Sequence, residues 1–119
     1  MAKEAPVKVL NQALGLEHAT RIQYLAHAEQ VDGLNAEPII ARLKEIADDE
    51  KSHEGMIRGL IGDYLGGTPS ISMTETHPAK TIKEILEVNL KDERHAVDVY
   101  TGILSRIRGM KDGLKHEYL

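Results

Sequence analysis

Residues 39–64 read IIARLKEIADDEKSHEGMIRGLIGDY, and this stretch decides the fold. At about 100° per residue its apolar side chains share one helix face; they are Ile39, Leu43, Ile46, Ile57, Leu60, Ile61 and Tyr64. Glu50 and His53 lie inside this stripe at i and i+3, so they are neighbours on that face. The stretch predicts a long helix that carries a carboxylate and an imidazole into the core.

Two other segments also place a glutamate inside an apolar stripe. In the first, Glu17 is surrounded by Leu10, Ala13, Leu14, Tyr24, Ala28 and Val31. In the last, Glu93 is surrounded by Ile82, Ile85, Leu86, Ala96, Val97, Tyr100, Ile103, Leu104 and Ile107. A buried carboxylate costs on the order of several kcal/mol unless positive charge meets it. Three carboxylates that converge on one core therefore predict a metal ion.

The types of ligand limit the range of metals that could bind but do not identify a single one. Carboxylate oxygens and an imidazole nitrogen suit iron in both oxidation states, and they also suit manganese or zinc. The chain has no cysteine, which removes disulfides, thiolate zinc sites and thiol nucleophiles together.

Length and charge exclude other classes of function. With 119 residues and 41% apolar content, residues 1–119 make one domain that is long enough for a real core. A net charge of −4 argues against a nucleic-acid surface and gives no cationic helix for a membrane. No targeting or membrane-spanning segment is apparent, so we expect a cytoplasmic protein.

Glycine and proline divide the chain into long helical runs. We expect helices over about 6–32, 38–66 and 78–108, with Gly33 and Gly109 as the stops after the first and third. The short turn at Gly33 makes the first two helices antiparallel neighbours. The loop from Gly66 to Pro78 is long enough to cross the bundle and leave the second and third helices parallel. The fold class is an all-α up-down helical bundle.

The apolar stripes of these helices require a further partner. The residues after Gly113 have the pattern of the first turns of a fourth helix, which is truncated here or supplied in trans by another copy. We therefore expect a homo-oligomer, either a dimer or a larger cage.

Particular runs of this chain resemble the bacterioferritins. The run Leu10–Glu17, LNQALGLE, followed by Gln23-Tyr24 and His27-Ala28, is similar to the first helix of that family. The run Asp49–His53, DEKSH, is similar to the Glu-x-x-His of the second helix, and Asn89–Glu93, NLKDE, to the acid of the third. The resemblance covers nearly the whole chain and implies a ferritin-like bundle of the di-iron carboxylate type.

The resemblance implies roles for single residues. Glu17 and His53 would ligate one iron, Glu50 would bridge, and Glu93 would ligate the second iron. Tyr24 matches a tyrosine close to the site. The implied activity is that of a ferroxidase, which oxidises Fe(II) to Fe(III) with dioxygen or peroxide for iron storage and detoxification.

Two departures from the family pattern change these expectations. The second Glu-x-x-His belongs to the family's fourth helix, and the present sequence ends before it, so the second iron lacks ligands within this chain. The haem-binding members carry a methionine after the bridging glutamate. Lys51 takes that place here, and Met56 falls on another face, so we expect non-haem iron alone.

Each candidate residue also has a structural interpretation. Glu17 could pair with Arg21 one turn along, and His53 could be a packed core histidine. Glu54 lies near the stripe, either beside the site or, as we expect, at a solvated edge. Tyr24 and Tyr100 could be core residues whose hydroxyls find one partner. We expect surface or capping positions for His18, His27, His77, His95 and His116.

Two other functions remain open at this level. The same bundle could act as a rubrerythrin-like peroxide reductase, which would need a separate electron donor because the chain has no cysteine. It could also be a non-enzymatic helical assembly module whose acids are held in ion pairs. Metal analysis separates the assembly module from the iron proteins, and the preference for peroxide or dioxygen separates the two enzymes.

Overall fold

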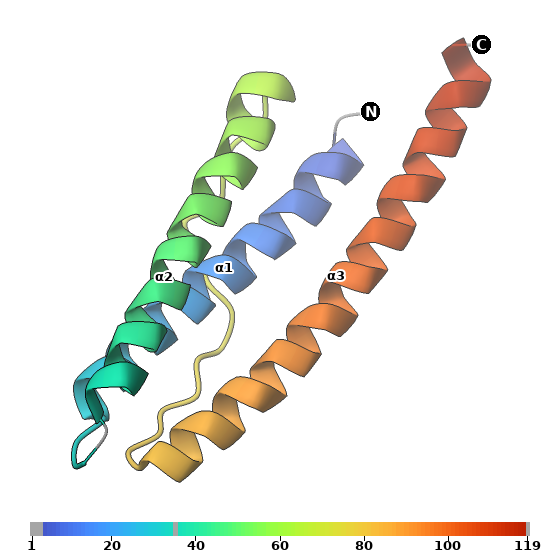
Figure 1. Cartoon of the computed structure of the whole chain (residues 1–119). Helices are drawn as coiled ribbons and strands as arrows, with labels where there is room; N and C mark the ends of the chain where they lie inside the picture. The colour runs from blue at the N-terminus through green and yellow to red at the C-terminus, as the bar shows by residue number, and fades with distance from the viewer. Residues whose placement is uncertain (1–3, 35, 119) are drawn as a thin grey trace.

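The computed structural model describes the backbone of residues 4–34 and 36–118 and the side chains up to Arg106. Its elements are α1 (Glu4–Gln30), α2 (Ala36–Gly59), the short π-helix η1 (Leu60–Tyr64) and α3 (Ile82–Tyr118). Helix α1 is antiparallel to both α2 and α3, which run parallel to each other (Figure 1). The described residues are therefore an all-helical bundle with the predicted directions.

A tight turn joins α1 to α2. The backbone N–H of Val31 donates to the carbonyl of His27 at 3.2 Å, and Gly33 then adopts a φ of 98°. This is the left-handed region, which glycine enters without the steric cost that a Cβ carries. The predicted stop at Gly33 is confirmed, and the short turn holds the two helices side by side.

Helix α2 ends in a wider turn of helix. In η1 the backbone N–H of Leu65 donates to the carbonyl of Leu60 at 2.9 Å, and Gly66 then turns the chain with a φ of 68°. A Cβ at Gly67 would lie 2.7 Å from Cγ2 of Val7, so glycine is needed where the chain passes α1. The predicted end at Gly66-Gly67 is confirmed to within two residues.

The connection from residue 65 to residue 81, which we call the strap, returns along α1 to the other end of the bundle (Figure 1). Its polar contacts are spread along the helix. Asn11 accepts from the Ser70 N–H at 2.7 Å, and the Thr74 N–H donates to the Gly15 carbonyl at 3.2 Å. The His18 ring bonds the Ser72 carbonyl at 2.8 Å. These bonds satisfy backbone groups that would otherwise lie unpaired against a helix.

Helix α3 starts later and ends later than the sequence predicts. It begins at Ile82 because the Thr81 hydroxyl caps it, accepting from the Glu84 N–H at 3.1 Å. It continues through Gly109 and Gly113 to Tyr118, so the predicted stop and the predicted start of a fourth helix are both wrong. A glycine inside a helix costs only about 1 kcal/mol, and no proline follows to break the run.

The core consists of two clusters of buried apolar side chains. One gathers near the α1–α2 turn and contains Tyr24, Ala28, Val31, Ala36, Leu43, Ala47, Ala79 and Ile85. The other gathers near the start of α1 and contains Val9, Ala13 and Ile103. Along α1, Glu17 falls between the two clusters. The prediction is confirmed for the stripe residues among them, which are Ala13, Tyr24, Ala28, Val31, Leu43, Ile85 and Ile103.

One side of the bundle remains open. The backbone of α3 approaches that of α1 and not that of α2 in the described chain. Leu60 and Tyr64, which the second stripe places inward, are exposed beyond α2. Four apolar side chains on α3 are exposed as well; they are Leu86, Leu90, Val97 and Leu104. We call these four α3 residues the open face. No helix of the described chain is both long and apolar enough to cross a membrane.

A buried ion pair joins α1 to α2. Glu54 is 2% exposed, and its Oε2 lies 2.5 Å from Nε of Arg21. The His18 ring and the Arg58 guanidinium approach its other oxygen at 3.4 and 3.9 Å. The expectation of a solvated edge position for Glu54 is wrong, because positive groups on both helices surround the carboxylate. Arg21 serves Glu54, which leaves Glu17 without that partner.

We expect Arg21→Met to lower the free energy of unfolding by about 3 kcal/mol, because it leaves Glu54 buried with only weaker partners. Arg42→Met is the matched control, since the Arg42–Glu45 pair on α2 is solvent-exposed and should contribute less than ~1 kcal/mol. Urea denaturation followed by circular dichroism measures both. If both variants lost the same free energy of unfolding, the buried pair of Arg21 and Glu54 would not be more stabilising than an exposed one.

Candidate metal centre

Helices α1 and α2 supply a cluster of two carboxylates and one histidine. Glu17 lies on α1, and Glu50 and His53 lie one turn apart on α2. One ligand atom from each residue lies within 4.8 Å of the other two. Nδ1 of His53 is 3.6 Å from Oε2 of Glu17 and 3.7 Å from Oε2 of Glu50. The structure thus brings together three of the four residues that the sequence selects as ligands.

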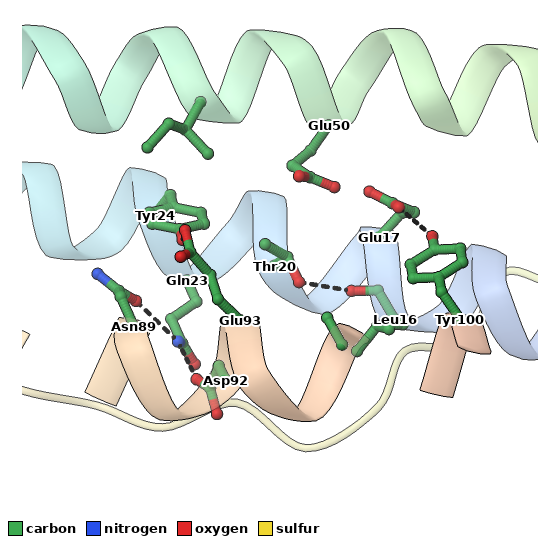
Figure 2. Close-up of a pocket in the computed structure, with 12 residues that line it drawn as sticks. Leu16, Glu17, Thr20, Gln23, Tyr24, Glu50, Asn89, Asp92, Glu93 and Tyr100 are labelled. Atoms are coloured by element: carbon green, nitrogen blue, oxygen red, sulfur yellow. Dashed lines mark hydrogen bonds between the residues drawn. The ribbon is translucent and has the colours of Figure 1, made fainter. Parts of the chain in front are cut away.

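Glu17 carries the unsatisfied atom of this cluster. The residue is 5% exposed, and its Oε2 has no hydrogen-bond partner. Figure 2 shows the carboxylate of Glu50 directed toward that of Glu17. Two carboxylates so close in a buried place repel each other, and a cation between them would relieve both. The donor set of oxygens and imidazole nitrogen fits a divalent transition metal.

Glu93 lines the same cavity from α3 but lies outside the three-residue cluster. The cavity has a volume of about 90 Å³, and Glu17, Glu50 and Glu93 are among its lining residues. Oε1 of Glu93 accepts a hydrogen bond from the Tyr24 hydroxyl at 3.0 Å. The residue itself is exposed because it borders the open face. Its carboxylate is therefore held at the far side of the cavity, beside Tyr24 (Figure 2).

Two tyrosines bond the carboxylates of the cavity. Tyr24 donates to Glu93, and Tyr100 on α3 donates to Oε1 of Glu17. Burial raises the pKa of the Tyr24 phenol, and the charge of Glu93 raises it further. Burial also raises the pKa of the Tyr100 phenol, with the hydrogen bond to Glu17 as the next cause. Both phenols therefore keep their protons and act as donors at neutral pH.

The cluster is open to solvent on the histidine side. The side chain of His53 is 49% exposed, whereas that of Glu50 is 17% exposed. The buried Glu17 and the partly buried Glu50 thus lie behind an accessible imidazole, and the expectation that the second helix carries His53 into the core is wrong. An ion from solvent can reach the cluster without any helix moving.

Sequence reasoning missed a polar network beside the cavity. The Gln23 amide donates to Asp92 at 2.5 Å and to Asn89 at 3.2 Å, and its oxygen accepts from the His77 N–H at 2.5 Å. His27 is buried and bonds the His77 carbonyl, so the expected surface position for His27 is wrong. No periodic pattern marks these residues, because the strap brings His77 to α1. The network anchors α3 and the strap to α1.

The fold and the cluster together define a class. They describe a bundle of long helices that brings carboxylates and a histidine together from neighbouring helices, which is the arrangement of the helical carboxylate metalloproteins.

Comparison with known proteins identifies the family. The sequence profile of the ferritin-like domain matches residues 7–119. A bacterial ferritin of Pseudomonas aeruginosa is 32% identical over 90 residues, which cover 75% of this chain and 57% of that protein. The chain thus spans little more than half of that relative. No solved structure gives a significant match. The chain belongs to the ferritin-like family, as the sequence motifs predicted.

The raised pKa values of the tyrosines can be tested by spectrophotometric titration. At about pH 11 an ordinary phenol is mostly ionised, whereas Tyr24 and Tyr100 should remain protonated while the protein is folded. The difference in phenolate absorbance between the wild type and the Tyr24→Phe, Tyr100→Phe double variant should therefore be close to zero at that pH.

The raised pKa values of Tyr24 and Tyr100 also predict how the free energy of unfolding changes at alkaline pH. Unfolding returns the pKa of these phenols to the ordinary tyrosine value of 10.0. The free energy of unfolding should accordingly fall as the pH rises above that value, and fall less in the double variant. A phenolate signal from the folded wild type that is lost in the double variant would contradict the assignment.

Proposed function

We propose that the chain is a ferroxidase and iron-storage subunit that takes Fe(II) as its substrate and oxidises it to Fe(III). The observation that carries this proposal is the buried Oε2 of Glu17, which has no hydrogen-bond partner and lies 3.6 Å from His53 Nδ1. A buried, unpaired carboxylate oxygen is costly without a cation. Membership of the ferritin-like family makes iron the expected cation.

The residues have separate tasks in this proposal. Glu17 and His53 would hold one iron, with Glu50 shared between two positions. Glu93 would serve the second position across the cavity. Iron supplies the redox chemistry when bound, giving up one electron per ion to dioxygen or peroxide. The protein holds the carboxylates close together, and the protonated phenols of Tyr24 and Tyr100 bond one oxygen each of Glu93 and Glu17.

The open face supports self-association. Its side chains Leu86, Leu90, Val97 and Leu104 are each at least half exposed along one side of α3. A row of exposed apolar side chains next to Glu93 is typical of a surface that packs against a partner protein. We propose that another copy of the chain supplies this cover and closes the open side of the cavity. A cytoplasmic location, where Fe(II) is available, agrees with the absence of cysteine.

Glu50→Ala should abolish tight Fe(II) binding while helix content stays near that of the wild type, because Glu50 is shared by both metal positions and does not pack in either core cluster. Glu45→Ala is the matched control, since Glu45 is an exposed acid on the same helix. Anaerobic Fe(II) titration gives the stoichiometry per chain, and admission of oxygen then gives the rate of ferric absorbance. Fe(II) binding that survives in Glu50→Ala would refute the proposed bridge.

Leu90→Glu should convert the assembly to monomer, because it places a charge in the middle of the open face. Lys91→Glu is the matched control, because Lys91 is exposed on α3 and lies about 100° around the helix from Leu90; it should leave the assembly intact. Static light scattering after gel filtration measures the mass of each. A wild-type protein that is monomeric at all concentrations would exclude completion of the site by a second copy.

A further inference from the structure

Two stretches of the sequence share one spacing between a glutamate and a tyrosine. Glu17 and Tyr24 on α1 are separated by the same interval as Glu93 and Tyr100 on α3. This interval is about two helical turns, so each tyrosine lies on the same face as its own glutamate. Because α1 and α3 run antiparallel (Figure 1), each tyrosine meets the glutamate of the other helix.

The two hydrogen bonds have different neighbours. Tyr24 bonds Glu93, which lies outside the three-residue cluster. Tyr100 bonds Oε1 of Glu17, which lies inside it. Its bond leaves Oε2 of Glu17 as the free oxygen, and this is the atom beside Nδ1 of His53. Only the Tyr100 bond therefore acts directly on an atom of the cluster.

The chemistry of the phenol makes this bond directional. A tyrosine hydroxyl is protonated at neutral pH, so the Tyr100 hydroxyl is the donor in its hydrogen bond to the carboxylate. A carboxylate has no proton to donate in return when ionised, so the bond occupies Oε1 without competing for Oε2. The ring of Tyr100 packs beside the cluster of Val9, Ala13 and Ile103, which fixes where the hydroxyl points.

We propose that Tyr100 is a positioning residue of the metal centre, whose hydroxyl holds Oε1 of Glu17 so that Oε2 alone is presented to a divalent cation with Glu50 and His53. This inference rests on the proposed function, because it requires that the cluster bind metal. Its consequence is that a ligand on α1 is oriented from α3. Removing the hydroxyl would free Glu17 to turn both oxygens toward the metal or away from it.

Tyr100→Phe tests the hydroxyl alone, since phenylalanine keeps the ring that packs in the core. The probe is Co(II), titrated into the metal-free chain of 119 residues without oxygen and followed by its visible absorption. Outer ligand partners typically contribute 10–100-fold to metal affinity, so we expect Co(II) affinity to fall by about tenfold or more. The band of the bound Co(II) should also weaken per ion, because a second oxygen from Glu17 raises the coordination number.

Tyr64→Phe is the matched control, because Tyr64 is 78% exposed on η1 and bonds neither carboxylate. It should reproduce the wild-type affinity and spectrum. If Tyr100→Phe also reproduces both, the positioning role is overturned while the proposed metal site stands. If the wild type itself binds no Co(II), the proposed function fails and the positioning role fails with it.

A measurement on folded Tyr24→Phe protein covers the case in which Tyr100→Phe loses its helix content. Zn(II), which has no visible spectrum of its own, should perturb the near-ultraviolet tyrosine absorption as it binds, because the phenol of Tyr100 remains bonded to a metal ligand. A flat difference spectrum at saturating Zn(II) would overturn the inference.

Discussion

Two buried glutamates, Glu54 and Glu17, lie between α1 and α2, and each carboxylate requires a positively charged partner. Glu54 has its partners within the protein, because Arg21, His18 and Arg58 surround it. Glu17 has a hydroxyl at one oxygen, whereas its other oxygen has no hydrogen-bond partner and only the His53 ring 3.6 Å away. The same helix pair thus holds one carboxylate that is satisfied and one that is not. The ion pairs of Glu54 stabilise the fold. The unsatisfied oxygen of Glu17 carries an unfavourable desolvation free energy, which a bound cation would reduce.

Polar side chains hold the strap and α3 against α1 in addition to the two apolar clusters. Gln23 links α1 to Asn89, Asp92 and His77, and the tyrosines link α1 and α3 at both ends of the cavity. Hydrogen bonds of this kind require definite geometry, whereas apolar contacts tolerate sliding. Helix α3 is therefore set in one register against α1. That register places Glu93 at the rim of the same cavity as Glu17 and Glu50.

Periodicity explains why much of this arrangement could be predicted from the sequence. The stripes with Glu17, Glu50 and Glu93 and the glycine signals at Gly33 and Gly66 predicted the helices, their directions and the cluster. The features that the sequence analysis missed depend on contacts between helices and on the small energetic cost of a single glycine in a helix. Glu54 becomes buried only because Arg21 reaches it from another helix, and Gly109 is carried inside α3 because a single glycine is a weak break. Glu93 follows the stripe but borders a face that the described part of the chain leaves uncovered.

Because the strap covers α1, we expect α3 to unfold locally before α1 does. Helix α1 is enclosed by α2, by the strap and by α3, whereas α3 contacts α1 along one side and leaves its other side in solvent. Amide protons of α3 should therefore exchange with solvent before those of α1, since less burial is lost when α3 detaches. Detachment would take Tyr100 away from Glu17 without separating Glu17 from Glu50. A sub-global opening of this kind would move Tyr100 and Glu93 away from Glu17, Glu50 and His53 while the α1–α2 hairpin stays folded.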